Sequence, residues 1–396
     1  MPKLNSRRLS RHRPRAELLH PEFGCHDALV QDGLAVLISG AGIAGSTLAA
    51  LLGREGHRVT VLERDQGVRS SGNPVDVRKG AYQVAEQLGV LPRLRDAGTS
   101  VRELIFVDAA GRQMASMRTR QSEAREVEVP RADLSAILVD AGRAAAEFLF
   151  DEMINELRPD ESGVEVIFDR TAPRRFDLVV GADGIHSGVR RLAFGPEADF
   201  VEHLGMYVAT AKVGVRLEGD DTVIMHNEPG TAVALHPGTG SPLAAFIFRS
   251  RARIDHRDPA ASRRLLEQTY RRDAWRTEEL LSAYLATDDV YFDSVSRIRM
   301  PSWSRGRITL LGDAASCVSL FGDGSSSAME GAAALAASLT SSLDDIPTAL
   351  ARYESTHRAV IRPRQRGVRI ASHLLIPRSR LEITLRDLAL RLVGRR

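Results

Sequence analysis

The chain has 396 residues, 43% hydrophobic and 27% charged, with a formal net charge of +3. This composition is ordinary for a globular protein with room for two cores, and it excludes a disordered chain. The 2 cysteines, Cys25 and Cys317, show no metal-ligand spacing, so neither a disulfide framework nor a zinc site is expected. Since no apolar run nears the roughly 20 residues of a membrane span, we expect a soluble cytoplasmic protein with no membrane partner and no metal.

The first 32 residues form a basic extension. It carries 6 Lys or Arg and no acidic residue before Glu17. It has neither the apolar region of a secretion signal nor aromatic residues between its basic ones. We therefore expect a flexible arm rather than a nucleic-acid-binding segment.

The first expected strand covers residues 34–39, LAVLIS, and is followed at once by GAGIAG. A helical pattern comes next, and then a second strand, RVTVLERD, which closes with Glu63. In this setting Gly40 permits the tight turn, Gly42 lets a pyrophosphate approach the backbone, and Gly45 lets helix and strand pack. Glu63 is placed to accept hydrogen bonds from ribose hydroxyls. The pattern predicts a dinucleotide site.

A second strand-tip motif lies in residues 176–195, FDLVVGADGIHSGVRRLAFG. The strand ends in Asp183 and Gly184, and a helix starts near Ser187 and Arg190. One interpretation is simply another strand and helix, with Ser187 as the helix N-cap. The other is a further contribution to a cofactor site.

The third motif is the stretch LLGDAASCVSLFGDGSSSAMEGAAALA, residues 310–336. One interpretation is a plain strand, loop and helix, with Asp313 capping and glycines permitting the turn. The other is a ligand cradle, in which Asp313 accepts from a sugar-like hydroxyl and the next helix's amides face an electron-rich group.

Three strand-tip glycine motifs in this order resemble the class A FAD-dependent monooxygenases with the para-hydroxybenzoate hydroxylase fold, over about residues 34–360. The chain also resembles aromatic polyketide and antibiotic tailoring hydroxylases and tetracycline-type inactivating monooxygenases. The stretch from Pro130 to Leu138 is similar to the family's Arg-x-x-Leu helix. The resemblance implies FAD contacts at Gly40, Gly42, Gly45, Glu63, Arg64, Arg131, Asp183, Gly184, Asp313, Gly322, Gly324, Ser325 and Ser326.

The implied fold class is α/β. A Rossmann-type FAD-binding domain interleaves with an antiparallel-sheet substrate domain, and a C-terminal helix follows. The FAD-binding domain takes residues 33–105, 128–195 and 291–360, and the substrate domain takes 106–127 and 196–290. Residues 1–32 are the basic extension, and 361–396 are a C-terminal helical segment.

The glycine loop of the third motif departs from the family pattern. Ser316 stands where the family has a histidine, no proline follows, and the loop is one residue shorter. Ser325 and Ser326 stand near the place of the family's asparagine. FAD binding is still expected, and we carry two alternatives to a monooxygenase: a flavoprotein oxidase or dehydrogenase, and a redox-silent FAD-bound cyclase or scaffold.

The substrate region has alternating segments in residues 200–250, which predict an antiparallel sheet. One or two amphipathic helices within residues 263–286 are expected to cover it. His226 and His236 lie in this sheet, and the sequence does not reveal which sheet face either one occupies. In the last segment, a capping box from Ser379 to Glu382 starts a helix whose leucine stripe we expect to dock on the protein.

The function implied by the resemblance is hydroxylation of an aromatic or polycyclic small molecule, through a flavin C4a-hydroperoxide formed from NADPH and O2. No protein side chain is assigned as catalytic, because the flavin carries the chemistry. One dinucleotide fingerprint is present, and FAD is expected to occupy it. NADPH is therefore expected to bind transiently in a surface groove beside Arg190 or Arg191. The oligomeric state is not predicted.

Overall fold

A computed structural model describes residues 33–67, 73–118, 125–217, 219–238, 240–255, 257–271, 274–317 and 323–393. The predictions for the basic extension and for Gly322 lie outside these residues. From Gly33 onward the chain forms one compact unit.

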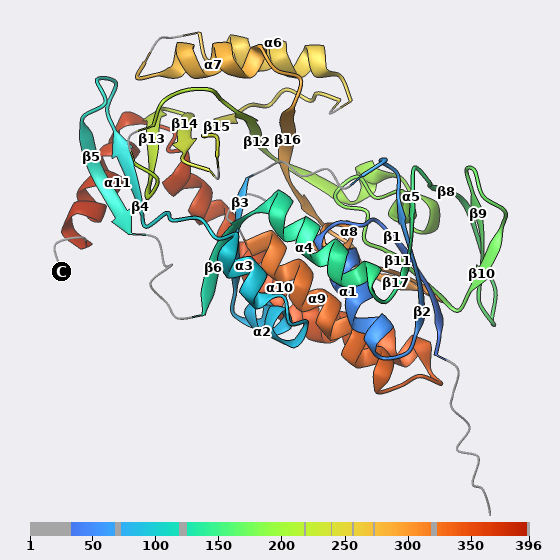
Figure 1. Cartoon of the computed structure of the whole chain (residues 1–396). Helices are drawn as coiled ribbons and strands as arrows, with labels where there is room; N and C mark the ends of the chain where they lie inside the picture. Colours follow the sequence, from blue (N-terminus) through green and yellow to red (C-terminus); the bar gives the residue numbers. More distant parts are fainter. Residues whose placement is uncertain are drawn as a thin grey trace, which may run out of the picture. The chain divides into compact units, whose positions relative to one another are not determined.

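The motif-bearing sheet has six strands in the order β17-β18-β11-β1-β2-β7 (Figure 1). Its strands are β1 Ala35–Ser39, β2 Arg58–Glu63, β7 Glu147–Phe150, β11 Leu178–Gly181, β17 Ser304–Arg305 and β18 Ile308–Leu310. All neighbours pair in parallel except β17 and β18. The carboxyl ends of β1, β11 and β18 therefore meet at one edge of the sheet, which is where ligands bind in open α/β folds.

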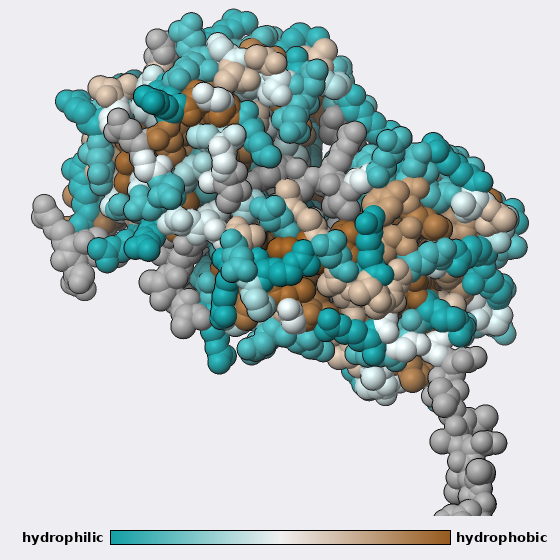
Figure 2. Space-filling view, in the orientation of Figure 1, coloured by the Kyte–Doolittle hydropathy of each residue, from teal (hydrophilic) through white to brown (hydrophobic). Residues whose placement is uncertain are grey.

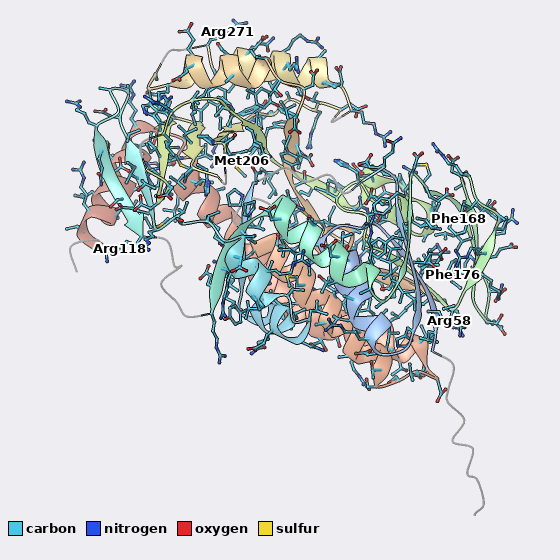
Figure 3. All side chains as sticks on the ribbon, in the orientation of Figure 1. Arg58, Arg118, Phe168, Phe176, Met206 and Arg271 are labelled. Carbon is cyan, nitrogen blue, oxygen red and sulfur yellow. The ribbon has the colours of Figure 1, made fainter. Side chains whose placement is uncertain are left out.

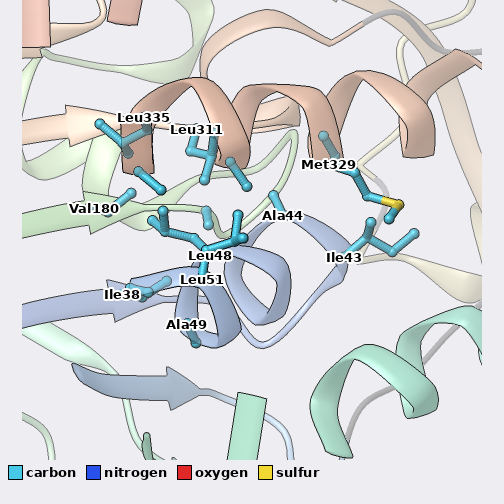
Figure 4. Packing of buried hydrophobic residues seen from close by; sticks show 14 of the residues in the cluster. Ile38, Ile43, Ala44, Leu48, Ala49, Leu51, Val180, Leu311, Met329 and Leu335 are labelled. Carbon is cyan, nitrogen blue, oxygen red and sulfur yellow. The ribbon is translucent and has the colours of Figure 1, made fainter. Parts of the chain in front are cut away.

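Helices pack on this sheet around one large apolar core. α1 (Ile43–Arg54) lies against both α4 (Arg131–Arg143) and α9 (Asp323–Thr340). Figure 4 shows Leu48 of α1 below Leu311 and below Leu335 and Met329 of α9, in the cluster that also includes Val180. The adjoining helices are α2 Gly80–Gln87, α3 Leu91–Asp96, α5 Gly188–Ala193, α8 Asp313–Ser316 and α10 Ile346–Leu375.

Two smaller sheets complete this part. The first contains β8 (Ile154–Pro159), β9 (Val164–Phe168) and β10 (Arg174–Phe176). In it Phe168 and Phe176 meet edge to face with ring centroids 6.4 Å apart (Figure 3). The second is an antiparallel ribbon of β3 (Pro74–Arg78) and β6 (Glu126–Pro130).

The substrate-side sheet has seven strands in the order β16-β12-β15-β14-β13-β4-β5. These are β4 Glu103–Val107, β5 Gln113–Arg118, β12 Val201–Lys212, β13 Thr222–Glu228, β14 Thr231–His236, β15 Leu243–Arg249 and β16 Val290–Ile298. The predicted antiparallel sheet is confirmed. However, β4 joins β13 in parallel. The predicted domain boundaries at 105/106, 127/128, 290/291 and 360/361 fall inside β4, β6, β16 and α10, and the division into two domains stays a prediction.

The two faces of this sheet have different neighbours. On the outer face, Tyr207, Phe246 and Phe248 pack beneath α6 (Pro259–Thr269) and α7 (Thr277–Leu285), as the sequence predicted. Hydrophilic side chains predominate over these two helices along the upper edge of Figure 2. The inner face carries Thr210 and His236 among other residues. Part of it packs against Leu375 and Ile376 at the end of α10 and Leu390 further along the chain, and its edge strand β16 contacts α8.

The last helix, α11 (Arg380–Val393), begins with the predicted capping box, since the Glu382 amide donates to Ser379 Oγ at 3.2 Å. The prediction that its leucine stripe docks is wrong. The four leucines, Leu381, Leu385, Leu388 and Leu392, are 52–67% exposed. The opposite face docks instead, because Arg386 pairs with Asp387 and lies over the Phe106 ring. No helix in the described part of the chain is long and apolar enough to cross a membrane.

Candidate cofactor site

The first glycine motif forms a tight turn between β1 and α1. Gly40 has φ +105°, and a Cβ there would lie 2.5 Å from the Ala182 carbonyl oxygen. A Cβ on Gly45 would lie 1.9 Å from the Gly40 oxygen, so helix and strand require glycine at this contact. At Gly42 a Cβ would meet nothing within 4 Å, although this residue is the N-cap of α1 and has no side-chain cap. The start of α1 therefore presents backbone amides to open space.

Glu63 stands at the end of β2 beside this turn. Its carboxylate accepts from the Ala41 amide at 3.1 Å and from the Asp65 amide at 3.2 Å. These bonds hold the carboxylate at the mouth of the glycine turn, where the sequence placed an acceptor for ribose hydroxyls. Arg64 follows it and is exposed.

The three strand-tip motifs come together in space. Ala182, before the Asp-Gly pair, donates its amide to the Ser39 carbonyl at 2.8 Å. Gly312 has φ +62°, and a Cβ there would lie 2.9 Å from the Ala44 Cβ of α1. Glycine at position 312 thus allows the third motif to lie directly against the start of α1.

Asp313 is the first residue of α8 and is only partly exposed to solvent. Burial raises the pKa of its carboxyl, while the positive charge of Arg131 acts in the opposite direction. Arg131 begins α4 and donates its amide to the Asn73 carbonyl at 3.0 Å. The structure therefore brings Arg131 and Asp313, which are 182 positions apart in the sequence, into one electrostatic environment.

Asp183 organises the start of α5. Its carboxylate accepts from the Ser187 hydroxyl and from the Val189 amide, the latter at 3.0 Å. Ser187 is also the N-cap, accepting from the Arg190 amide at 2.9 Å. The structural interpretation of Ser187 is therefore confirmed. Gly184 adopts φ +78° with open space around it.

The position of Arg190 contradicts the prediction that it contacts NADPH at the surface. Its side chain is not on the surface, because the residue is 0% exposed. Its guanidinium donates to the carbonyls of Ala314, at 3.0 Å, and Ile185, and so ties the second motif to the third. A fully enclosed guanidinium cannot serve as a transient contact for NADPH. Arg191, the neighbouring residue, is exposed, so a contact between Arg191 and NADPH stays a proposal.

This difference predicts opposite behaviour for the two arginines. Arg190→Ala should destabilise the protein by about 3 kcal/mol or more, because two buried carbonyls lose a charged donor. Arg191→Ala should leave the melting temperature unchanged and should raise the NADPH concentration needed for half-maximal flavin reduction. Thermal melts and stopped-flow reduction of both variants check this. A stable Arg190→Ala protein with weakened NADPH binding would instead support Arg190 as an NADPH contact.

The start of α9 differs from the predicted glycine loop with FAD contacts. Gly324, Ser325 and Ser326 belong to the first turn of this helix rather than to a loop. Ser326 is buried, and its hydroxyl donates to the Asp76 carbonyl at 2.7 Å and accepts from the Arg78 amide at 3.2 Å. This hydroxyl therefore holds β3 and is not directed at a ligand. The backbone amides of this turn remain as proposed contacts.

These features fit an FAD molecule. An open helix N-terminus for the pyrophosphate, a carboxylate for ribose and a second carboxylate beside an arginine are arranged around one sheet edge. A family model described as an FAD binding domain matches residues 33–365. A flavin-dependent monooxygenase of Legionella longbeachae serogroup 1 (strain NSW150) is 31% identical over 354 residues, covering 87% of this chain and 90% of that protein. The chain belongs to the class A FAD-dependent monooxygenases.

Two further proteins are similar to this monooxygenase. An uncharacterized protein of Mycobacterium tuberculosis (strain ATCC 25618 / H37Rv) is 38% identical over 341 residues, covering 83% of this chain and 91% of the relative. The crystal structure of the tetracycline destructase Tet(55) matches with a TM-score of 0.80 and 29% identity, over 92% of this chain and 96% of that one. The predicted α/β fold and enzyme class are thereby confirmed.

The strand register of this monooxygenase also separates the two histidines. His226 pairs with Val107 and turns to the outer face, where its Nδ1 lies 3.0 Å from the Val107 carbonyl and its ring lies near Trp275. His236 turns to the inner face and contacts Glu128 on β6. Only His236 therefore faces the part of the protein that carries the cofactor motifs.

Two carboxylates near the site were missed by the sequence analysis. Asp76 on β3 and Glu128 on β6 lie directly opposite each other in the ribbon. The signal was present in the stretches PVDVR and EVEVP, where polar residues alternate with valines. Such alternation predicts one buried and one accessible strand face.

Proposed function

We propose that this monooxygenase hydroxylates an aromatic or polycyclic small molecule, using NADPH and O2. The observation that carries the proposal is the meeting of three glycine motifs beside the seven-stranded sheet, where α8 contacts β16 and the charges of Arg131 and Asp313 act on Tyr291. Val208, Ala245, Tyr291 and Asp293 on the inner face of this sheet are all partly exposed, so solvent reaches the surface beside the cofactor motifs. A substrate lying there would be within reach of a flavin held by the motifs.

Each part of the proposed site has a separate task. The amides at the start of α1 and the Glu63 carboxylate would hold the pyrophosphate and ribose, and Asp313 with Arg131 would hold the ribityl chain. Reduced by NADPH and combined with O2, FAD would supply the activated oxygen atom. The chain's own contribution is to orient the substrate and to exclude water from the reacting atoms.

The substrate class is supported by the residues that are partly exposed on the inner face and by one structural neighbour. Two small residues on it, Val208 and Ala245, are partly exposed, whereas Ala232 and Ala234 are buried in a hydrophobic cluster. Tyr291 and Asp293 on β16 border these residues on one side, and His236 on β14 on the other. The structural similarity to a tetracycline destructase is consistent with a polycyclic substrate.

The test begins with purification, where the protein should be yellow and should release non-covalent FAD on denaturation. Incubation with NADPH, 18O2 and a panel of phenols and polycyclic aromatic ketones should then give a product that is heavier by one labelled oxygen atom. A flavoprotein oxidase would instead give an unlabelled product and hydrogen peroxide. A redox-silent protein would act without NADPH, and a colourless protein would contradict FAD binding altogether.

A further inference from the structure

We propose that Asp76 accepts the proton of an acidic hydroxyl on the substrate, while Glu128 is held opposite it by hydrogen bonds. The inference rests on the proposed function, because it concerns the same substrate. It also goes further, since it names a proton acceptor in the protein and requires a phenolic or enolic hydroxyl on the molecule that binds.

The β3-β6 ribbon separates its side chains into two sets. Val75, Val77 and Val129 point into the core and are at most 8% exposed. The alternate residues Asp76 and Glu128 lie directly across from each other on the opposite face of the ribbon. Two carboxylates in this relation repel each other, so their protonation is coupled.

Hydrogen bonds hold the Glu128 carboxylate in position. Its carboxylate accepts from the Thr99 hydroxyl and lies 3.2 Å from His236 Nε2. The other nitrogen of that ring, Nδ1, accepts from the Gly238 amide at 3.0 Å. Since Nδ1 is an acceptor, the proton of the neutral ring must be on Nε2, where it is donated to Glu128. Thr99 and His236 therefore fix the position of the Glu128 side chain opposite Asp76.

Asp76 has no comparable donor set in the described residues. Arg78 lies 3.4 Å from it, but the same guanidinium is bonded to Asp323 and is 3.5 Å from Glu126. Burial is the main cause that raises the pKa of Asp76, to about 6, and Arg78 opposes it while Glu128, Glu126 and Asp323 add to it. Asp76 is thus ionised at neutral pH, and uptake of a proton would relieve its repulsion with three neighbouring carboxylates.

Asp76 is also accessible and correctly placed. Its side chain is 24% exposed. Its backbone carbonyl accepts from Ser326 in the first turn of α9, and its partner Glu128 contacts His236 on the inner sheet face. The residue therefore lies between the first turn of α9, whose backbone amides remain proposed cofactor contacts, and the sheet face proposed for the substrate.

The step is a single proton transfer. The substrate O–H bond breaks, the proton goes to a carboxylate oxygen of Asp76, and the electron pair stays on the substrate oxygen. Asp76 becomes neutral and the substrate becomes an anion, so the total charge is unchanged. The anionic oxygen makes the ring more electron-rich, which favours attack on an electrophilic oxygen atom.

The test uses the FAD-loaded oxidised protein, with 4-nitrophenol and 4-nitro-1-naphthol as probes whose absorbance reports their ionisation. Because an ionised Asp76 disfavours a second anion beside it, bound probe should ionise at a pH at least one unit higher in the parent than in Asp76→Asn, a tenfold difference in proton affinity. Asp140→Asn, on the exposed side of α4, is the matched control and should behave as the parent. Glu128→Gln should give an intermediate midpoint, because one of the two opposed carboxylates is then removed while Asp76 remains.

Equal ionisation midpoints in the parent and Asp76→Asn would overturn the proposal. So would the failure of both probes to bind, since the proposal requires recognition of an acidic hydroxyl. If Asp76→Asn does not fold, Glu128→Gln carries the test, and an unchanged midpoint there contradicts the role. No NADPH or O2 is used, so a negative result here is separate from a failure of oxygen transfer.

Discussion

Replacing Gly42 with alanine is expected to weaken FAD binding by about 100-fold or more, or roughly 3 kcal/mol, while leaving the apoprotein intact. The added methyl group would meet no protein atom within 4 Å. It would instead occupy the space in front of the α1 amides, where the pyrophosphate must approach. The backbone at Gly42, with φ −70°, suits alanine, so the apoprotein should gain up to about 1 kcal/mol.

The matched control for this experiment is Gly45→Ala. There the methyl group would lie 1.9 Å from the Gly40 oxygen, so α1 must move away from β1 and the apoprotein itself should melt earlier. Thermal melts of the two apoproteins, followed by FAD titration, separate the effects. If Gly42→Ala binds FAD as tightly as the parent, the pyrophosphate does not lie against this turn.

Replacement of Asp313 by asparagine should affect cofactor affinity and protein stability in opposite directions. Loss of a charge-assisted hydrogen bond to the cofactor should weaken FAD binding roughly 10- to 150-fold, or about 1.5–3 kcal/mol. The apoprotein should become more stable near neutral pH, because a carboxylate that burial disfavours is replaced by a neutral group of the same size.

The gain in apoprotein stability from Asp313→Asn should increase with pH. Burial raises the folded-state pKa of Asp313 above its unfolded value, so its contribution to stability is full at low pH and is lost as pH rises through the folded pKa. The melting temperatures of the parent and Asp313→Asn apoproteins should therefore diverge as pH increases from 4 toward 8. A constant difference, together with unchanged FAD affinity, would remove Asp313 from the site.

The cofactor motifs were predictable because each one is local. A strand, a glycine turn and a helix start are contiguous, and parallel pairing brings the ends of β1, β11 and β18 to one edge. The burial of Arg190 was not predictable, since it depends on the Ala314 carbonyl, 124 positions away in the sequence. An arginine just after a strand tip looks exposed until the partner that encloses it is known.

The sequence also does not reveal which face of a helix or strand is buried. The helical pattern of α11 defines an apolar and a polar side, and the polar side docks because Arg386 reaches Asn227 Oδ1 at 2.7 Å and lies over Phe106. Likewise, the sequence does not reveal which sheet face His226 or His236 occupies, because this depends on the register of the β13-β14 hairpin. The proposed acceptor Asp76 was overlooked because its counterpart Glu128 lies 52 positions away in the sequence.

The order of strands in the six-stranded sheet has a consequence for how the chain acquires its cofactor during synthesis. β1 is flanked by β11, and β11 by β18, so neighbours in the sheet come from near residues 35, 178 and 308. Closing such long loops before any native contact forms is entropically costly and slows folding. A chain still on the ribosome lacks the third strand tip until more than three quarters of its length has emerged. We therefore expect FAD to associate after translation with a nearly complete chain, and no amino-terminal fragment that ends before β18 to retain it.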